Sequence, residues 1–200
     1  QLTSLDLRNG NNSNLTLFYA IGNLNLSCVD VDDPAWSNAN WTGIDSWVSF
    51  SINCSPESGY TYVPDNNFEQ ALIDLGYDSF LDDYVLTTNI NTVVTLDLNN
   101  ESIADLTGIE DFTALSILDC QSNQLINLDL NNNIALTELF SQNNQLTSLN
   151  IKNGNNINMS IFYSVNNPNL YCIEVDDPNW SSANWTNIDS QSSFDTDCSP

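Results

Sequence analysis

The chain has 200 residues, and the 41% of them that are hydrophobic suffice for a packed core. It has 26 acidic residues and only two basic residues, Arg8 and Lys152, so the formal net charge is −24. This charge repels phosphate groups and anionic lipid, which argues against nucleic-acid binding and makes cations the natural small partners. No apolar run is long enough to cross a bilayer, so we expect no membrane insertion.

Residues that carry much of catalytic chemistry are missing from the sequence. There is no His, the commonest general base, and neither a G-x-S-x-G segment nor a Walker-type phosphate loop. The many carboxylates could lie close together by chance, so a close pair would not indicate a glycosidase. We expect no enzymatic activity and no required cofactor.

Residues 1–56 recur at 145–200 without a gap, with 34 of 56 positions identical. This duplication predicts two domains. Residues 57–200 form one complete module, and residues 1–56 form the last coil and C-terminal cap of a preceding module, with residues 55–60 as a short linker. We therefore expect a parent sequence that continues in at least one direction, as a tandem array.

The cysteines follow the same duplication. Cys28 and Cys54 are 26 residues apart, as are Cys172 and Cys198, which predicts two local disulfides and leaves Cys120 alone. Zinc is disfavoured because there is no His and no close Cys-x-x-Cys pair. Disulfides are typical of an oxidising compartment, so we expect an extracellular or cell-surface protein.

Residues 64–76 have the pattern of an amphipathic helix. Asp65 can cap its first turn, and Gly76 can end it. Its apolar stripe consists of Phe68, Ala71, Leu72 and Leu75. This helix would cover the first coil of the module, as part of an N-terminal cap at residues 57–92.

A shorter period follows the helix. The segments VVTLDLNNESI, LSILDCQSNQL, LTELFSQNNQL and MSIFYSVNNPNL succeed one another in steps of 22, 21 and 23 residues, from Val93 to Met159. This pattern resembles the leucine-rich repeat, L-x-x-L-x-L-x-x-N-x-L, over residues 93–170. The resemblance implies a leucine-rich-repeat solenoid with short parallel β-strands, an irregular convex side, a helical N-terminal cap and a disulfide-closed C-terminal cap at residues 171–200.

Alternation within each repeat separates inward from outward side chains. The inward positions are Leu96, Leu98, Leu118, Cys120, Leu139, Ser141, Phe162 and Ser164. We expect Cys120 to be a small buried apolar residue rather than a reactive thiol. Asn123, Asn144 and Asn167 fall at the turns, where their side chains can satisfy buried backbone groups.

The module also resembles the asparagine-rich repeat proteins exported by marine Bacteroidetes such as flavobacteria. YTYVPDNNFEQALIDLGYDSFLDDYVLTTNI, then DLTGIEDFTAL, then the Cys-bounded NWTNID segment follow that family's order from cap to cap. The resemblance implies a bacterial origin, export by the type IX route, and a role as a surface or adhesive module. It implies no ligand and no catalytic residue.

Acidic runs are the candidates for metal binding. Calcium favours clustered oxygen ligands, although the EF-hand spacing is absent. The alternative is that Asp33-Pro34 and Asp177-Pro178 form turns and the other carboxylates are solvated. The equivalent candidates in the two caps are Asp30, Asp32, Asp33, Glu174, Asp176 and Asp177; Asp78, Asp82 and Asp83 follow the helix.

Outward positions of the strands are the candidate contact surface, because apolar residues accumulate there toward the end of the module. This surface comprises Ile117, Phe140, Ile161, Tyr163 and Val165, with Leu17, Tyr19 and Ile21 as the equivalents in the first copy. The alternative is that a cap or a neighbouring module covers these side chains.

The tryptophans could stack on sugars, but Trp36, Trp41, Trp180 and Trp185 recur at the same places in both caps, which favours a role in the cap core. Trp47 corresponds to Gln191, so we expect it to be exposed and to contact a neighbour.

Two functions remain open at this level. The first is a structural unit of a self-assembling fibre or stalk, built from identical modules or chains. The second is an adhesion module that binds protein or glycan through its strand face, either on its own or appended to a secreted enzyme. A fibre predicts faces buried against identical copies, whereas a receptor predicts a solvated strand face.

Overall fold

The computed structural model describes residues 2–52, 54 and 59–199, which form two compact units, Gln1–Ser58 (unit 1) and Gly59–Pro200 (unit 2). The expected module boundary at 56/57 and most of the expected linker lie outside the described residues. None of the helices in the described ranges combines the length and the apolar character that a membrane span needs.

Unit 1 is a short stack of coils closed by a disulfide. Strands β1 and β2 are parallel and in register, and Asp6 and Tyr19 form isolated bridges to Asp30 and Gly43. The disulfide joins Cys28 to Cys54, as the spacing predicts. The elements of unit 1 are η1 (Asn12–Asn14), β1 (Cys28–Asp30), α1 (Pro34–Asn40) and β2 (Ser49–Ser51).

Unit 2 begins with the expected N-terminal cap. Asp65 caps helix α2, and its carboxylate accepts hydrogen bonds from the N–H groups of Asn67 and Phe68. Leu75 does not belong to the buried stripe: the helix ends at Asp74, and Leu75 is exposed. The cap consists of β3 (Tyr60–Tyr62), α2 (Asn66–Asp74), β4 (Tyr84–Leu86) and α3 (Thr87–Ile90), with β3 and β4 antiparallel.

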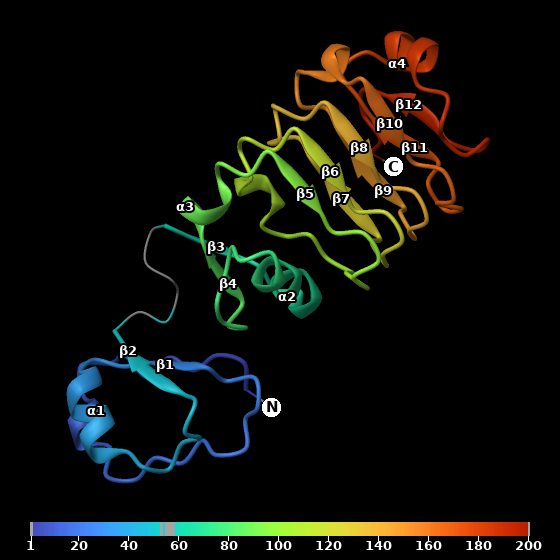
Figure 1. The fold of residues 1–200 in the computed structure, drawn as a ribbon. Helices are drawn as coiled ribbons and strands as arrows, with labels where there is room; N and C mark the ends of the chain where they lie inside the picture. The colour runs from blue at the N-terminus through green and yellow to red at the C-terminus, as the bar shows by residue number, and fades with distance from the viewer. Residues whose placement is uncertain (1, 53, 55–58, 200) are drawn as a thin grey trace. The chain divides into compact units, whose positions relative to one another are not determined.

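The four repeats supply successive neighbours of one parallel sheet, here called the rung sheet (Figure 1). Leu96, Leu118, Leu139 and Phe162 stand in register and are buried. The expected stacking of coil upon coil is confirmed. The strands of the rung sheet are β5 (Thr95–Asp97), β6 (Ile117–Asp119), β8 (Glu138–Phe140) and β10 (Ile161–Tyr163).

The opposite side of the coils is more regular than the repeat pattern indicates. It carries a second parallel sheet, in which Leu128, Leu149 and Ile173 are buried in register. Each strand of this second sheet is three residues long, and its central residue points inward between two outward neighbours. The second sheet consists of β7 (Asn127–Asp129), β9 (Ser148–Asn150), β11 (Cys172–Glu174) and β12 (Ser193–Asp195), and the remaining short helices are η2 (Ile109–Asp111) and η3 (Asn156–Asn158).

The asparagines at the turns join each coil to its neighbour. The amide of Asn144 donates to the carbonyl of Cys120 (2.9 Å) and to that of Ser141 (3.2 Å), and its oxygen accepts from the N–H of Leu125 (3.0 Å). Asn123 and Asn167 make equivalent bonds. These side chains satisfy buried backbone groups, as predicted.

The C-terminal cap closes the stack. The disulfide Cys172–Cys198 encloses helix α4 (Pro178–Asn184). The ring of Trp185 stacks on Phe162, with 4.6 Å between ring centroids, and Trp41 stacks on Phe18 in the same way in unit 1. Trp41 and Trp185 are buried, which confirms that the repeated tryptophans build the cap cores. Cys120 is buried and free, as expected.

Candidate functional site

The outward side chains of the rung sheet form one continuous surface, here called the strand face. The strand register aligns them in two columns across the four coils. The first column is Thr95, Ile117, Glu138 and Ile161, and the second is Asp97, Asp119, Phe140 and Tyr163. The structure therefore brings four of the predicted contact residues of unit 2 onto a single face, and the fifth, Val165, follows β10.

The strand face changes character from its first coil to its last. On the first coil Asp97 and Asn99 are exposed and hydrogen-bonded to each other. On the last two coils the rings of Phe140 and Tyr163 lie parallel, with 5.8 Å between centroids and an interplanar angle of 8°. Ile117, Ile161 and Val165 are half-buried around them. One end of the face is acidic, and the other is an aromatic surface suited to an apolar or planar ligand.

Unit 1 exposes its copy of this surface much more. Tyr19 is 72% exposed, whereas its counterpart Tyr163 is 38% exposed. Leu17 and Ile21 are also largely exposed, whereas Ile161 and Val165 are half-buried. The difference arises because β10 pairs with β8, and no strand among residues 2–52 takes that place beside Tyr19.

The same comparison extends to residues that lie inside the stack in unit 2. Leu146 is 0% exposed and Met159 4%, because a preceding coil covers them. Their counterparts in unit 1, Leu2 and Leu15, are 43% and 39% exposed. We call Leu2, Leu15, Leu17, Tyr19 and Ile21 the open face of unit 1.

Trp47 is half-exposed, as its replacement by Gln191 in the second copy predicts. The expected contact of Trp47 with a neighbour stays a prediction.

The predicted metal ligands of unit 1 have backbone partners. The Asp32 carboxylate accepts from four successive N–H groups, those of residues 9–12, at 3.0–3.2 Å. Those hydrogen bonds, that from Gly10 foremost, hold the pKa of Asp32 below its ordinary value. Asp33 caps helix α1, and Asp30 accepts from the N–H of Cys54 and lies 3.7 Å from Arg8.

The equivalent acidic residues of unit 2 are used in the same way. Asp176 accepts from the N–H groups of Gly154 and Asn156, Asp177 caps helix α4, and Glu174 lies 3.8 Å from Lys152. Within the described ranges, neither set converges as three ligands of one ion. Asp33 and Asp177 cap helices instead of only forming turns, and the carboxylates of Asp32 and Asp176 bond to backbone N–H groups. Calcium binding by these two sets stays a prediction.

Parts of the chain are similar to known proteins. No family model matches the chain. Internalin J of Listeria monocytogenes is 37% identical over 72 residues, which are 36% of this chain and 8% of that protein. The chain thus spans a small part of this relative's length.

Two solved structures of L. monocytogenes proteins are similar to part of this chain. The functional domain of InlJ, described as including a cysteine ladder, is 24% identical with a TM-score of 0.46, over 72% of this chain and 29% of that one. An internalin, InlF, is 19% identical with a TM-score of 0.48, over 66% of this chain and 43% of that one. The repeat pattern, the stacked parallel strands and the asparagine turns decide the fold. The chain has the fold of a leucine-rich-repeat solenoid.

One acidic residue that was not predicted from the sequence is buried in the leucine-rich-repeat fold. Glu69 is fully buried within helix α2. Its position was a usable signal, because it lies directly after Phe68 and three residues before Leu72, on the apolar side of the helix. A carboxylate at such a position is costly to bury and calls for a partner.

Proposed function

We propose that this leucine-rich repeat chain is a non-catalytic, extracellular module whose open face binds a coil of its own kind, supplied by an identical module or chain. The difference in exposure between the two copies carries this proposal. One sequence, present twice, buries Leu146 and Met159 under a coil in unit 2 and leaves Leu2 and Leu15 half in solvent in unit 1.

A covering coil would add both burial and backbone pairing. In unit 2 the carbonyls of Tyr163 and Val165 accept hydrogen bonds from the N–H groups of Ser141 and Asn143 on the preceding coil, at 2.8 and 3.1 Å. Tyr19 and Ile21 are the corresponding residues of the open face. Burying the exposed part of Leu2 or Leu15 would contribute about 1 kcal/mol each.

The extracellular location in this proposal follows from the two disulfides and from the acidic surface. The non-catalytic role follows from the missing catalytic residue types and from the repeat fold, which presents a surface rather than enclosing a substrate. Assembly through the open face would make the chain a unit of a stalk or fibre.

Sedimentation velocity over a range of concentrations tests the proposal. We expect the 200-residue chain to associate, and we expect the double variant Leu2→Asp with Leu15→Asp to remain monomeric. The matched control replaces Ile134 and Ile157 by Asp, since both are exposed apolar residues of unit 2 outside the open face. A monomeric wild-type chain at millimolar concentration, or equal association of both variants, would contradict the proposal.

A second candidate function is adhesion through the strand face, supported by the stacked pair Phe140 and Tyr163. Affinity electrophoresis against a panel of polysaccharides, with the variant Phe140→Ala plus Tyr163→Ala, tests it. Retardation of the wild-type chain that the variant loses would favour a glycan ligand. No retardation in any gel would leave the glycan form of this candidate without support.

A further inference from the structure

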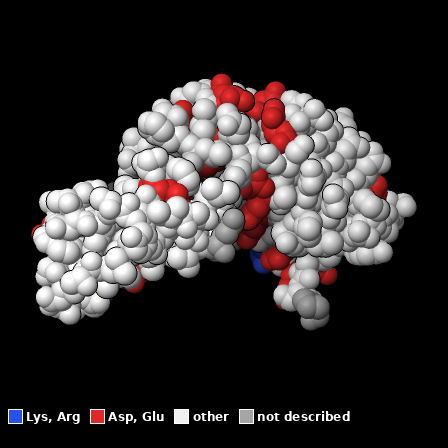
Figure 2. All heavy atoms as spheres, turned by 90° about the horizontal axis from the view of Figure 1, so that it is seen from below, with Lys and Arg blue, Asp and Glu red and all other residues white. Residues whose placement is uncertain are grey.

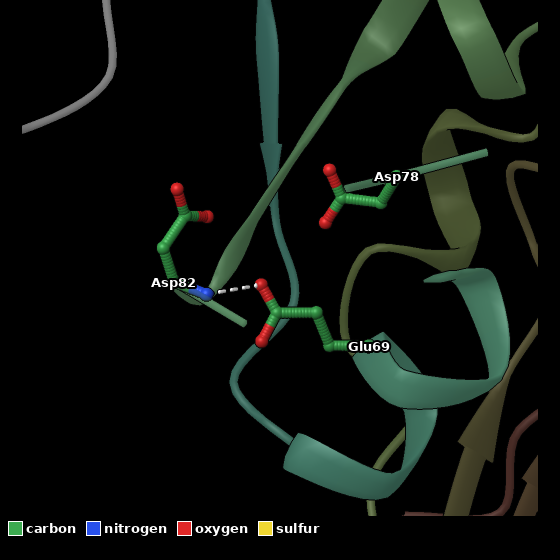
Figure 3. Close-up of side chains that lie close together, drawn as sticks. All are labelled: Glu69, Asp78 and Asp82. Carbon is green, nitrogen blue, oxygen red and sulfur yellow. Dashed lines mark hydrogen bonds between the residues drawn. The ribbon is translucent and has the colours of Figure 1, made fainter. Parts of the chain in front are cut away.

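Three carboxylates converge in the N-terminal cap of unit 2. Glu69 belongs to helix α2, and Asp78 and Asp82 belong to the segment between α2 and β4. One oxygen from each lies within 4.8 Å of the corresponding oxygen of the other two. Figure 3 shows the three side chains directed toward a common space, with the Asp82 N–H bonded to Glu69.

Two buried oxygens of this cluster have no hydrogen-bond donor. The Glu69 Oε1 atom accepts from the N–H groups of Asp82 (2.8 Å) and Tyr84 (3.1 Å). The Glu69 Oε2 atom is buried without a partner among the described residues, and so is the Asp78 Oδ2 atom. Leaving a buried carboxylate oxygen unsatisfied is strongly unfavourable, so this arrangement favours either a bound cation or a proton shared between the carboxyl groups.

No side chain of the protein can supply that cation. The sequence contains only two basic residues. Arg8 bonds to Asp6 and lies near Asp30 in unit 1, and Lys152 lies at Glu174 and bonds to the carbonyl of Thr196. Acidic side chains gather in several patches on the face seen in Figure 2, where only a small basic area is visible. The compensating charge must come from solution.

The raised pKa values of Glu69 and Asp82 agree with buried negative charge that no basic side chain compensates. Burial, which outweighs the two backbone hydrogen bonds, raises the pKa of Glu69 to about 7. Burial also raises the pKa of Asp82, with the nearby Asp78 charge adding to the effect.

We propose that Glu69, Asp78 and Asp82 bind one divalent cation, and that Ca²⁺ is the preferred ion. Calcium takes oxygen ligands at about 2.3–2.6 Å, so two oxygens on one ion lie at most about 5 Å apart, as observed here. Magnesium needs a tighter octahedron, and zinc prefers the nitrogen and sulfur ligands that this cluster lacks. Asp82 is exposed, which leaves room for water ligands.

A bound ion would join helix α2 to the segment that leads into β4, and so fix the cap that covers the first coil. This site differs from the acidic runs of the two C-terminal caps, where backbone N–H groups already occupy the carboxylates. It also goes beyond the proposed assembly, because the open face belongs to unit 1 and the cluster to unit 2.

Isothermal titration of CaCl₂ into the chelator-treated 200-residue chain, in a background of monovalent salt, tests this site. We expect one ion per chain, with a Kd of about 10⁻⁴–10⁻³ M, the range of extracellular calcium modules. Glu69→Gln and Asp82→Asn should each weaken binding at least tenfold. Asp74→Asn is the matched control, since it removes the same charge from an exposed position on α2.

A thermal melt gives a second readout that does not depend on heats of binding. Millimolar CaCl₂ should raise the melting temperature of the wild-type chain and of Asp74→Asn, and should leave that of Asp82→Asn unchanged. Because Asp82 is exposed, this variant remains informative if Glu69→Gln fails to fold. Absence of binding and of a melting shift, or binding that all variants retain, would overturn the site; tighter binding of Mg²⁺ would overturn the assignment to calcium.

Discussion

Asn144 shows how a single side chain joins two coils. Its shorter hydrogen bonds satisfy the carbonyls of Cys120 and Ser141 and the N–H of Leu125, all in the interior. We expect Asn144→Ala to lower the free energy of unfolding of unit 2 by about 3 kcal/mol, because buried backbone groups would lose their partners. Urea denaturation followed by circular dichroism measures this loss.

The control at this scale is Asn132→Ala, since Asn132 is exposed in the preceding coil. It should change the stability by less than about 0.5 kcal/mol, as surface substitutions usually do. If Asn144→Ala is as mild as this control, the asparagine turns do not stabilise the stack.

The turn around Asp32 illustrates how an element depends on one charge. The four N–H groups of residues 9–12 stabilise the ionised carboxylate and lower its pKa below that of the unfolded chain. The folded state therefore holds this proton less tightly than the unfolded state. The contribution of Asp32 to stability is complete above the ordinary pKa of Asp, and it is lost as the pH falls through the lowered folded-state pKa.

We therefore expect Asp32→Asn to destabilise unit 1 at neutral pH and to have little effect at acid pH, because an amide has one acceptor oxygen where the carboxylate has two. Thermal melts followed by tryptophan fluorescence between neutral pH and pH about 2 measure the difference between variant and wild type. Asp74→Asn in helix α2 is the control for loss of one charge. If the difference in melting temperature between Asp32→Asn and the wild-type chain does not become smaller at acid pH, the ionised Asp32 carboxylate is not the origin of this stability.

At the scale of the whole molecule, the rung sheet and the capping helix were predictable from the sequence, whereas the second sheet and the cluster around Glu69 were not. Leu96, Leu118, Leu139 and Phe162 recur at nearly constant spacing, and a recurring residue identifies a coil. The second sheet escaped prediction because the repeat pattern marks only the strands of the rung sheet, whereas the strands of the second sheet are set by the stacking of neighbouring coils. The place of Glu69 on the apolar side of the helix was a signal for a buried acid, but its neighbours Asp78 and Asp82 approach it only in the folded cap.

The two copies of one sequence also differ in what surrounds them, which predicts different stabilities for units 1 and 2. Val29 and Ile173 occupy equivalent, buried strand positions. However, β11 pairs with both β9 and β12, whereas β1 pairs with β2 and has only an isolated bridge to Asp6 on its other side. Local opening of unit 1 therefore disrupts fewer contacts between coils than opening of unit 2.

Native-state hydrogen exchange on the monomeric chain measures this difference directly. We expect the amide of Val29 to exchange at least about tenfold faster than that of Ile173, equivalent to about 1.4 kcal/mol of opening free energy. Raising the protein concentration should slow the exchange of Val29 selectively, because a coil bound to the open face would supply the missing neighbour. Equal protection of the two amides in the monomer would show that the disulfide and the aromatic core of the cap suffice without a covering coil.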